Sequence, residues 1–133
     1  MLTILFACVH NAGRSQIAAA FFNQLADPAK ARAISAGTQP AARLHPAVLE
    51  TMREAGIDLS AARPQKLTPA MAAGASLLIT MGCGEQCPYL PGVRREDWRL
   101  RDPQGLSAAE VRPIREEIRQ RVSELIGREK LGK

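Results

Sequence analysis

Residues 2–21 read LTILFACVHNAGRSQIAAAF: an apolar run, a short polar loop and then a helical pattern. The run from Leu2 to Ala7 predicts a short buried strand, of the kind that parallel sheets cover on both faces. Apolar side chains then recur every four positions and predict a helix from about Ser15 to Ala26. A buried strand followed at once by a helix indicates an α/β fold.

The rest of the chain continues this alternation. The expected elements are a strand over 31–37, a helix from Pro46 to a Gly56 cap, a short helix opened by Thr68-Pro69, a strand over 76–81, a loop over 82–106 with one brief strand, and a helix over 107–126. The order predicts a three-layer α/β domain with a mostly parallel central sheet of about four strands. We expect residues 1–133 to form a single domain.

Composition narrows the classes of partner. The net charge of +5 favours an anionic partner, but basic residues are interspersed with acids, and one Trp, one Tyr and three Phe offer little surface for base stacking. We therefore expect a small anion and no nucleic acid. The apolar N-terminal run is short and lacks a basic leader, and no segment is long enough to cross a membrane. These features predict a cytoplasmic protein whose three cysteines stay reduced.

The loop from Cys8 to Ser15 predicts an oxyanion site with a nucleophile at its base. Small residues between a strand and a helix let backbone N–H groups point inward, and the helix adds its positive end. Arg14 supplies a planar fork of donors, Ser15 can donate a hydrogen bond to the Cys8 sulfur, and the same field favours a thiolate. The predicted oxyanion-binding residues are Val9, His10, Asn11, Ala12, Gly13, Arg14 and Ser15. The alternative is a buried cysteine at a strand end with a packing role only.

The sequence CVHNAGRS at residues 8–15 resembles the active-site loop of low-molecular-weight protein tyrosine phosphatases and of the arsenate reductases built on the same fold. The resemblance extends over nearly the whole chain and is carried by SAGT (35–38), AGIDLS (55–60), LLITMGCGEQCP (77–88), REDW (95–98) and DPQG (102–105). It implies that Cys8 is the nucleophile, Arg14 the oxyanion clamp and Asp102 the acid that protonates the leaving oxygen. It also implies a hydrogen bond between Asn11 and Ser35 that supports the loop together with Ser15.

Two features favour arsenate over a phosphate ester. Gln104 and Gly105 follow the Asp-Pro pair, where phosphatases of this fold place aromatic residues that hold an aryl ring. Cys83 and Cys87 add two thiols, and a second thiol that attacks the sulfur of an arsenate-bound Cys8 would release arsenite and leave a disulfide. We expect Cys83 to attack and Cys87 to pass the disulfide outward. The segments CVHNAGRSQ (8–16) and MGCGEQCP (81–88) resemble more closely the actinobacterial-type reductases, some of which pass arsenic to a small thiol such as mycothiol. In that mechanism Cys8 suffices, and Cys83 and Cys87 would be bystanders.

The sequence thus predicts a thiol-dependent arsenate reductase that binds phosphate or sulfate as substrate mimics. We expect a monomer with no tightly bound cofactor and no metal, because the C-x3-C spacing is unusual for zinc and Arg14 would repel a cation. The external reductant is expected to be thioredoxin or a mycothiol/mycoredoxin-like system. Two alternatives remain open, namely a phosphatase and a non-catalytic oxyanion-binding or thiol-sensing module. His45-Pro46 is interpreted as a helix start and Trp98 as a core anchor.

Overall fold

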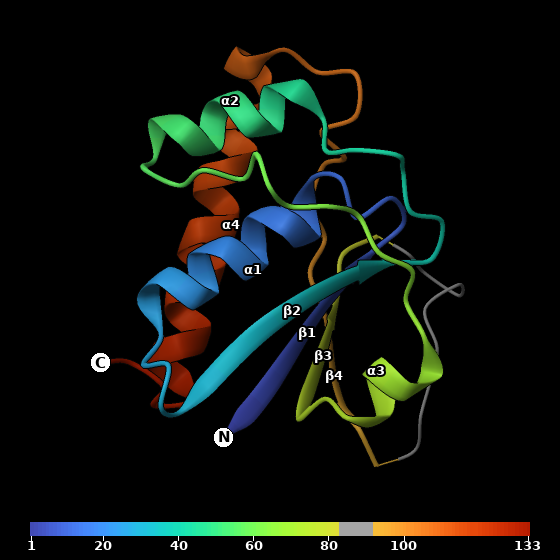
Figure 1. The fold of residues 1–133 in the computed structure, drawn as a ribbon. Coiled ribbons are helices and arrows are strands. Elements are labelled where there is room, and N and C mark those ends of the chain that lie inside the picture. Colours follow the sequence, from blue (N-terminus) through green and yellow to red (C-terminus); the bar gives the residue numbers. More distant parts are fainter. Residues whose placement is uncertain (83–91) are drawn as a thin grey trace.

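The computed structural model describes residues 1–82 and 92–133. Its sheet has four strands in the order β2-β1-β3-β4, every neighbouring pair parallel (Figure 1). The strands are β1 (Leu2–Cys8), β2 (Ala31–Gly37), β3 (Leu77–Thr80) and β4 (Arg94–Asp97). The predicted α/β class with a parallel sheet of about four strands is confirmed.

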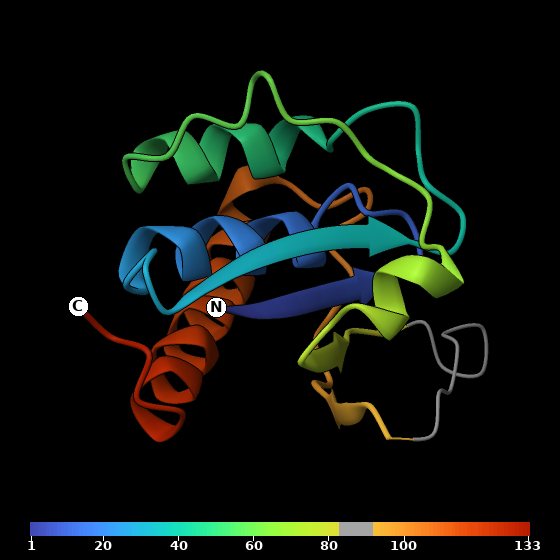
Figure 2. The ribbon, with the colours of Figure 1, turned by 60° about the horizontal axis from the view of Figure 1, so that its bottom comes forward.

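The helices lie in two layers on opposite faces of the sheet. One face is covered by α1 (Arg14–Leu25) and α4 (Ala108–Arg128), with α2 (Pro46–Glu54) packed against α4, and the short α3 (Pro69–Ala73) covers the other face (Figures 1 and 2). None of the helices in the two described ranges is both long and apolar enough to cross a membrane. Because every strand is parallel, all four carboxyl ends meet at one edge, which is where the loop after β1 lies.

Side chains along β1 point alternately to the two faces of the sheet, and each face has its own hydrophobic core. Phe6 and Cys8 point into the larger core under α1 and α4, whereas Leu5 and Ala7 point into a smaller one under α3. The Phe6 ring lies 5.6 Å, centroid to centroid, from that of Trp98, which is buried after β4. Trp98 therefore anchors this part of the predicted long loop to the core, as the sequence predicts.

The predicted boundaries differ from the observed ones by at most two residues, and those of β2 coincide. Ser107 is the N-cap of α4 and forms a capping box with Glu110, which explains why the helix begins there. Thr68 caps α3 through a hydrogen bond from the Met71 N–H group. The brief strand expected within 82–106 is β4, which adds to the edge of the sheet beside β3.

Candidate functional site

The loop after β1 is held so that its carbonyl groups face away from its concave side. The Asn11 carbonyl accepts a hydrogen bond from Gln16 Nε2 at 3.1 Å, and that of Gly13 accepts one from the Ile17 N–H group at 3.0 Å. The carbonyls of Cys8, Val9, His10 and Ala12 accept, at 2.8 to 3.1 Å, the backbone N–H groups of Thr38, Gln39, Ala41 and His45. With these acceptors engaged outside, N–H groups are left to line the interior, as an anion requires.

The N-terminal end of α1 adds to this positive lining. Its N-cap, Gly13, provides no side-chain cap, and the first turn contains no acidic residue. The first N–H groups of an α-helix have no partner within the helix, so they attract an anion that sits at this end. The loop and the helix start therefore form one anion cradle, residues 8–15, at the carboxyl end of the central strand.

The Cys8 sulfur lies at the base of the anion cradle, with 2% of the residue exposed. Ser15 Oγ is 2.9 Å from it, and the Asn11 N–H group donates to it at 3.3 Å. Asn11 Nδ2, which can only donate, also bonds to Ser15 Oγ at 2.7 Å. The hydroxyl accepts there, so its own proton is free for the sulfur. Two donors thus face the sulfur, an arrangement that supports an anionic nucleophile.

Asn11 is fixed by contacts that the loop sequence does not reveal. Its backbone is left-handed, with φ of 50°, and its side chain is fully buried. Its Oδ1 accepts from the Gln65 backbone N–H group at 3.0 Å and from Gln16 Nε2 at 3.1 Å. Gln65 Nε2 in turn donates to the Ser35 carbonyl at 2.7 Å.

The prediction of a direct hydrogen bond between Asn11 and Ser35 is therefore wrong. Within the described chain the Asn11 side chain bonds to Ser15, Gln16 and Gln65, and Ser35 supports the loop only through its backbone oxygen. The reason is geometric. The segment that contains Gln65 pairs with Gly37 at the end of β2, which brings the Gln65 N–H group to Asn11 Oδ1.

The Arg14 guanidinium is buried, with 6% of the residue exposed, and is only loosely partnered. Its Nη1 donates to the Leu100 carbonyl at 3.2 Å, and its Nη2 lies 3.8 Å from Asp102 Oδ2. A Cβ on Gly82, just after β3, would lie 2.4 Å from Nη1. Gly82 also has φ of +93°, so both space and backbone favour glycine there. Residues that follow β1, β3 and β4 thus converge on the guanidinium.

Asp102 lies at the rim, with 43% of its side chain exposed. Its Oδ1 accepts the Gln104 N–H group at 3.0 Å, a turn that fixes the carboxylate beside Arg14. His45, interpreted from sequence only as a helix start, lies close enough for the Asp102, His10 and Arg14 charges to act on it. Burial is the main cause that lowers the pKa of His45 below 6.5.

Cys83 and Cys87 lie outside the described residues, so their proposed roles stay predictions. Within residues 1–82 and 92–133, no group of three or more His, Cys, Asp or Glu side chains could hold a metal ion.

The matched family is described as the low molecular weight phosphotyrosine protein phosphatase family, and its model covers residues 3–133. The chain belongs to this family. The glutaredoxin arsenate reductase of Synechocystis sp. is 32% identical over 96% of this chain and 98% of that protein. Among solved structures, a thioredoxin-dependent arsenate reductase of Corynebacterium glutamicum is 40% identical with a TM-score of 0.85, over 98% of this chain. This chain spans only 63% of that protein.

A second family structure is an arsenate reductase in the phosphate-binding state, 32% identical with a TM-score of 0.82. It shares 96% of this chain and 98% of its own. That neighbour therefore binds phosphate.

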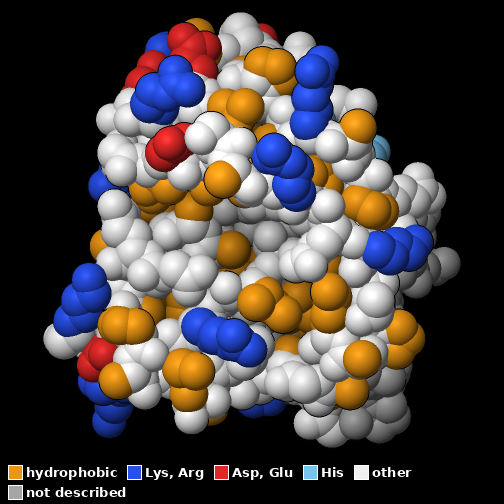
Figure 3. Space-filling model, in the orientation of Figure 1, with side chains coloured by type: hydrophobic (Ala, Val, Ile, Leu, Met, Phe, Trp, Pro, Cys, Tyr) orange, Lys and Arg blue, Asp and Glu red, His pale blue; other side chains and the backbone are white. Residues whose placement is uncertain are grey.

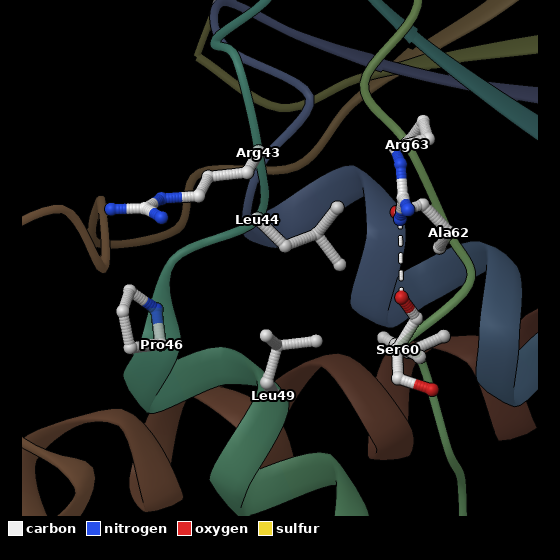
Figure 4. A pocket seen from close by; sticks show the side chains of 8 residues that line it. Arg43, Leu44, Pro46, Leu49, Ser60, Ala62 and Arg63 are labelled. Carbon is white, nitrogen blue, oxygen red and sulfur yellow. Dashed lines mark hydrogen bonds between the residues drawn. The ribbon is translucent and has the colours of Figure 1, made fainter.

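A separate cavity of about 470 Å³ lies beside α2. Figure 4 shows Leu44 and Leu49 at its centre, with Arg63 reaching toward the Ser60 carbonyl, to which it donates at 3.1 Å. Its lining contains no carboxylate, no cysteine and no histidine: Arg43, Leu44, Pro46, Leu49, Leu59, Ser60, Ala62 and Arg63. On the face drawn in Figure 3, Lys and Arg side chains are scattered and form no continuous stripe. The cradle, and not this cavity, is therefore the candidate active site of this family member.

Proposed function

We propose that the chain is a thiol-dependent arsenate reductase whose active site is the anion cradle, carried by a single domain over residues 1–133. The observation that carries this is the meeting of a twice hydrogen-bonded Cys8 sulfur and a buried, loosely paired Arg14 guanidinium on one loop. An oxyanion that replaces the weak contact to Asp102 gains a planar fork of donors on the same loop as a nucleophile. The arsenate reductase relatives at 32% and 40% identity support the choice of substrate.

The first step joins Cys8 to arsenic. The thiolate attacks hydrogen arsenate held by the N–H groups of the cradle and by Arg14, an As–S bond forms and an As–O bond breaks, and the hydroxyl oxygen leaves as water after it gains one more proton. Asp102 supplies a proton to that oxygen, because its carboxyl lies at the rim beside the guanidinium that orients the anion. Arsenic remains pentavalent in this step. The positive lining stabilises the charge on the arsenic oxygens throughout.

The second step transfers the electrons. A second thiolate attacks the Cys8 sulfur, an S–S bond forms and the As–S bond breaks, and its electron pair reduces As(V) to As(III), which leaves as arsenite. Two thiols are oxidised to one disulfide for each arsenate reduced. We propose Cys83 as the attacking thiol, Cys87 as its partner in relaying the disulfide, and an external thiol system, thioredoxin or a mycothiol type, as the final reductant.

The burial of the aromatic side chains favours arsenate over an aryl phosphate. Phe6, Phe21, Phe22 and Trp98 are each at most 5% exposed and lie in the core, while Tyr89 lies outside the described residues. After Asp102-Pro103 come Gln104 and Gly105, which offer no ring face. Gln104 and Gly105 therefore give a phenyl group nothing to stack on after the Asp-Pro pair.

The test is arsenate-dependent thiol oxidation, measured separately with a thioredoxin system and with a small-thiol system. We expect arsenite formation in one of them and its loss by at least about 10³-fold in Cys8→Ser. Hydrolysis of p-nitrophenyl phosphate is the comparison assay; efficient hydrolysis without arsenate reduction would assign the phosphatase instead. Sulfate binding with neither activity would leave only an oxyanion-binding module. Full thioredoxin-coupled turnover of Cys83→Ser would exclude the intramolecular relay alone.

A further inference from the structure

His45 lies against the anion cradle, although its backbone belongs to the start of another helix. It is the N-cap of α2, and its backbone N–H group donates to the Ala12 carbonyl at 3.0 Å. The ring packs on Gly13: its Cδ2 would be 3.3 Å from a Cβ placed there. Pro103, the neighbour of Asp102, packs against the same position, with its Cγ at 2.5 Å from that Cβ. The imidazole is thus part of the wall of the anion cradle and not a remote surface group.

Burial of the ring is the main cause that opposes protonation of the imidazole while the site is empty. His10 and Arg14 on the cradle side also disfavour the imidazolium. The N-terminal end of α2 carries a partial positive charge that acts in the same direction. Asp102, from the loop after β4, is the facing group that favours it. A tetrahedral dianion in the cradle would reverse this balance, because it places two negative charges among these groups.

We propose that His45 is a second cation of the oxyanion site, uncharged while the anion cradle is empty and protonated when a dianion occupies it. The ring then joins Arg14 in neutralising the anion. The inference rests on the proposed function only in taking the cradle as the anion site. It also predicts a preference between ligands, because a doubly charged oxyanion favours protonation of His45 more strongly than a singly charged one. Binding of a dianion is therefore linked to uptake of one proton from solvent.

The sign of this linkage follows from the two protonation states. Because bound dianion raises the pKa of His45, affinity increases as pH falls through the pKa of the complex and becomes constant below the pKa of the free protein. That window ends below 6.5, since the pKa of the free imidazole is lowered. At higher pH the ring is neutral in both states, so His45 contributes no pH dependence to the affinity there.

Sulfate is the probe for this linkage, because it stays a dianion over the whole range, unlike arsenate and phosphate. Its dissociation constant is measured calorimetrically from about pH 5 to about pH 8 in the full chain carrying Cys8→Ser, so that the thiol does not titrate. The matched chain also carries His45→Asn; asparagine is a favoured N-cap and keeps the start of α2. A third chain carries His10→Asn with Cys8→Ser.

We expect sulfate to bind about tenfold more tightly at the acid end with His45 present, which corresponds to a pKa difference of about one, and less than about twofold more tightly in His45→Asn. In the NMR titration of the imidazole carbons, sulfate should shift the His45 midpoint upward. An equal pH slope in His45→Asn, a slope removed by His10→Asn, or an unshifted midpoint overturns the proposal. The sulfate experiment does not measure reduction. A chain that binds sulfate in this way but fails to reduce arsenate would therefore contradict the proposed function and leave the proposal for His45 intact.

Discussion

Arg14 and the α4 arginines that bind α2 carry the same charge but have opposite surroundings. Glu54 at the end of α2 accepts two hydrogen bonds from Arg112, at 2.7 and 2.9 Å, and one from Arg115 at 3.1 Å, all at the surface. The Arg112 hydrogen bonds are the main cause that lowers the pKa of Glu54 to about 2. Arg14 is buried, yet its carboxylate partner, Asp102, lies 3.8 Å away.

This difference distinguishes two roles. The Glu54 ion pairs hold α2 against α4, whereas the Arg14 guanidinium is available to bind a ligand. The Glu54 cluster satisfies its carboxylate fully and gains little from doing so, because exposed pairs are screened by water. A buried guanidinium without a close counter-ion is costly, and a bound oxyanion reduces that cost. Tight geometry here therefore marks a structural contact, and loose geometry in a buried place marks the functional one.

Replacing Arg14→Lys should have the largest effect. The ammonium cannot donate through two parallel N–H groups, so we expect kcat/KM for arsenate to fall by about 10²- to 10³-fold. The matched control is Arg112→Lys, which should leave kcat/KM unchanged. Steady-state kinetics would contradict the comparison if Arg14→Lys kept more than about a tenth of the wild-type value.

Asp102→Asn should reduce kcat by about 10²-fold, because the amide cannot donate an acidic proton to the leaving oxygen. The asparagine Oδ1 can still accept from the Gln104 N–H group, so the turn is kept. Removal of a negative charge beside Arg14 should leave sulfate binding equal or tighter. Single-turnover kinetics with calorimetry separates the two effects, and a kcat within threefold of wild type would remove Asp102 from the chemistry.

Gly82→Ala tests whether the position of the guanidinium is set by the close approach of the backbone after β3. The methyl group would lie 2.4 Å from Nη1, so we expect sulfate affinity to fall by about tenfold. Gly56→Ala is the control, since that glycine is also left-handed, at φ +83°, with open space around it. Both changes should destabilise by about 1–2 kcal/mol, the strain of a left-handed alanine. Equal sulfate affinities for the two variants would contradict this reading.

Glu54→Gln should have the smallest effect, with unchanged kcat/KM and a melting temperature lowered by a few degrees at most. Because the pKa of Glu54 is lowered in the folded state, its contribution is present above the ordinary value of 4.5 and is lost as pH falls toward about 2. The difference in melting temperature from wild type should therefore vanish over that interval, and also in high salt. A difference that persists at pH 2 would show that packing, not charge, is involved.

Strands with apolar runs were predictable from the sequence, whereas β4 was only partly so. The segment from Leu2 to Cys8 is predicted as a strand without ambiguity, because it is an apolar run; its last five residues are buried in the structure. β4 consists of Arg94, Arg95, Glu96 and Asp97, a charged segment with little strand propensity. It forms at the edge of the sheet, where charged residues are tolerated, and the buried Trp98 that follows fixes its position.

The site was predictable where its residues are close in sequence. Cys8, Arg14 and Ser15 share one loop, so the strand–loop–helix pattern was enough to bring them together. Gln65, Gly82 and His45 reach the loop from distant segments, and nothing in their local sequence reports the Asn11, Arg14 or Gly13 contacts that they make. Such contacts depend on the packing of complete elements.

The loosely partnered guanidinium also makes the folding stability of the chain depend on buffer composition. Any oxyanion that occupies the native cradle and not the unfolded chain raises the free energy of unfolding, by about 2.7 kcal/mol at a hundred times its dissociation constant. Melting curves recorded in phosphate or sulfate would then report ligation together with folding, and variants that weaken the cradle would look less stable than they are. Stabilities of this protein are best compared in a buffer free of tetrahedral anions.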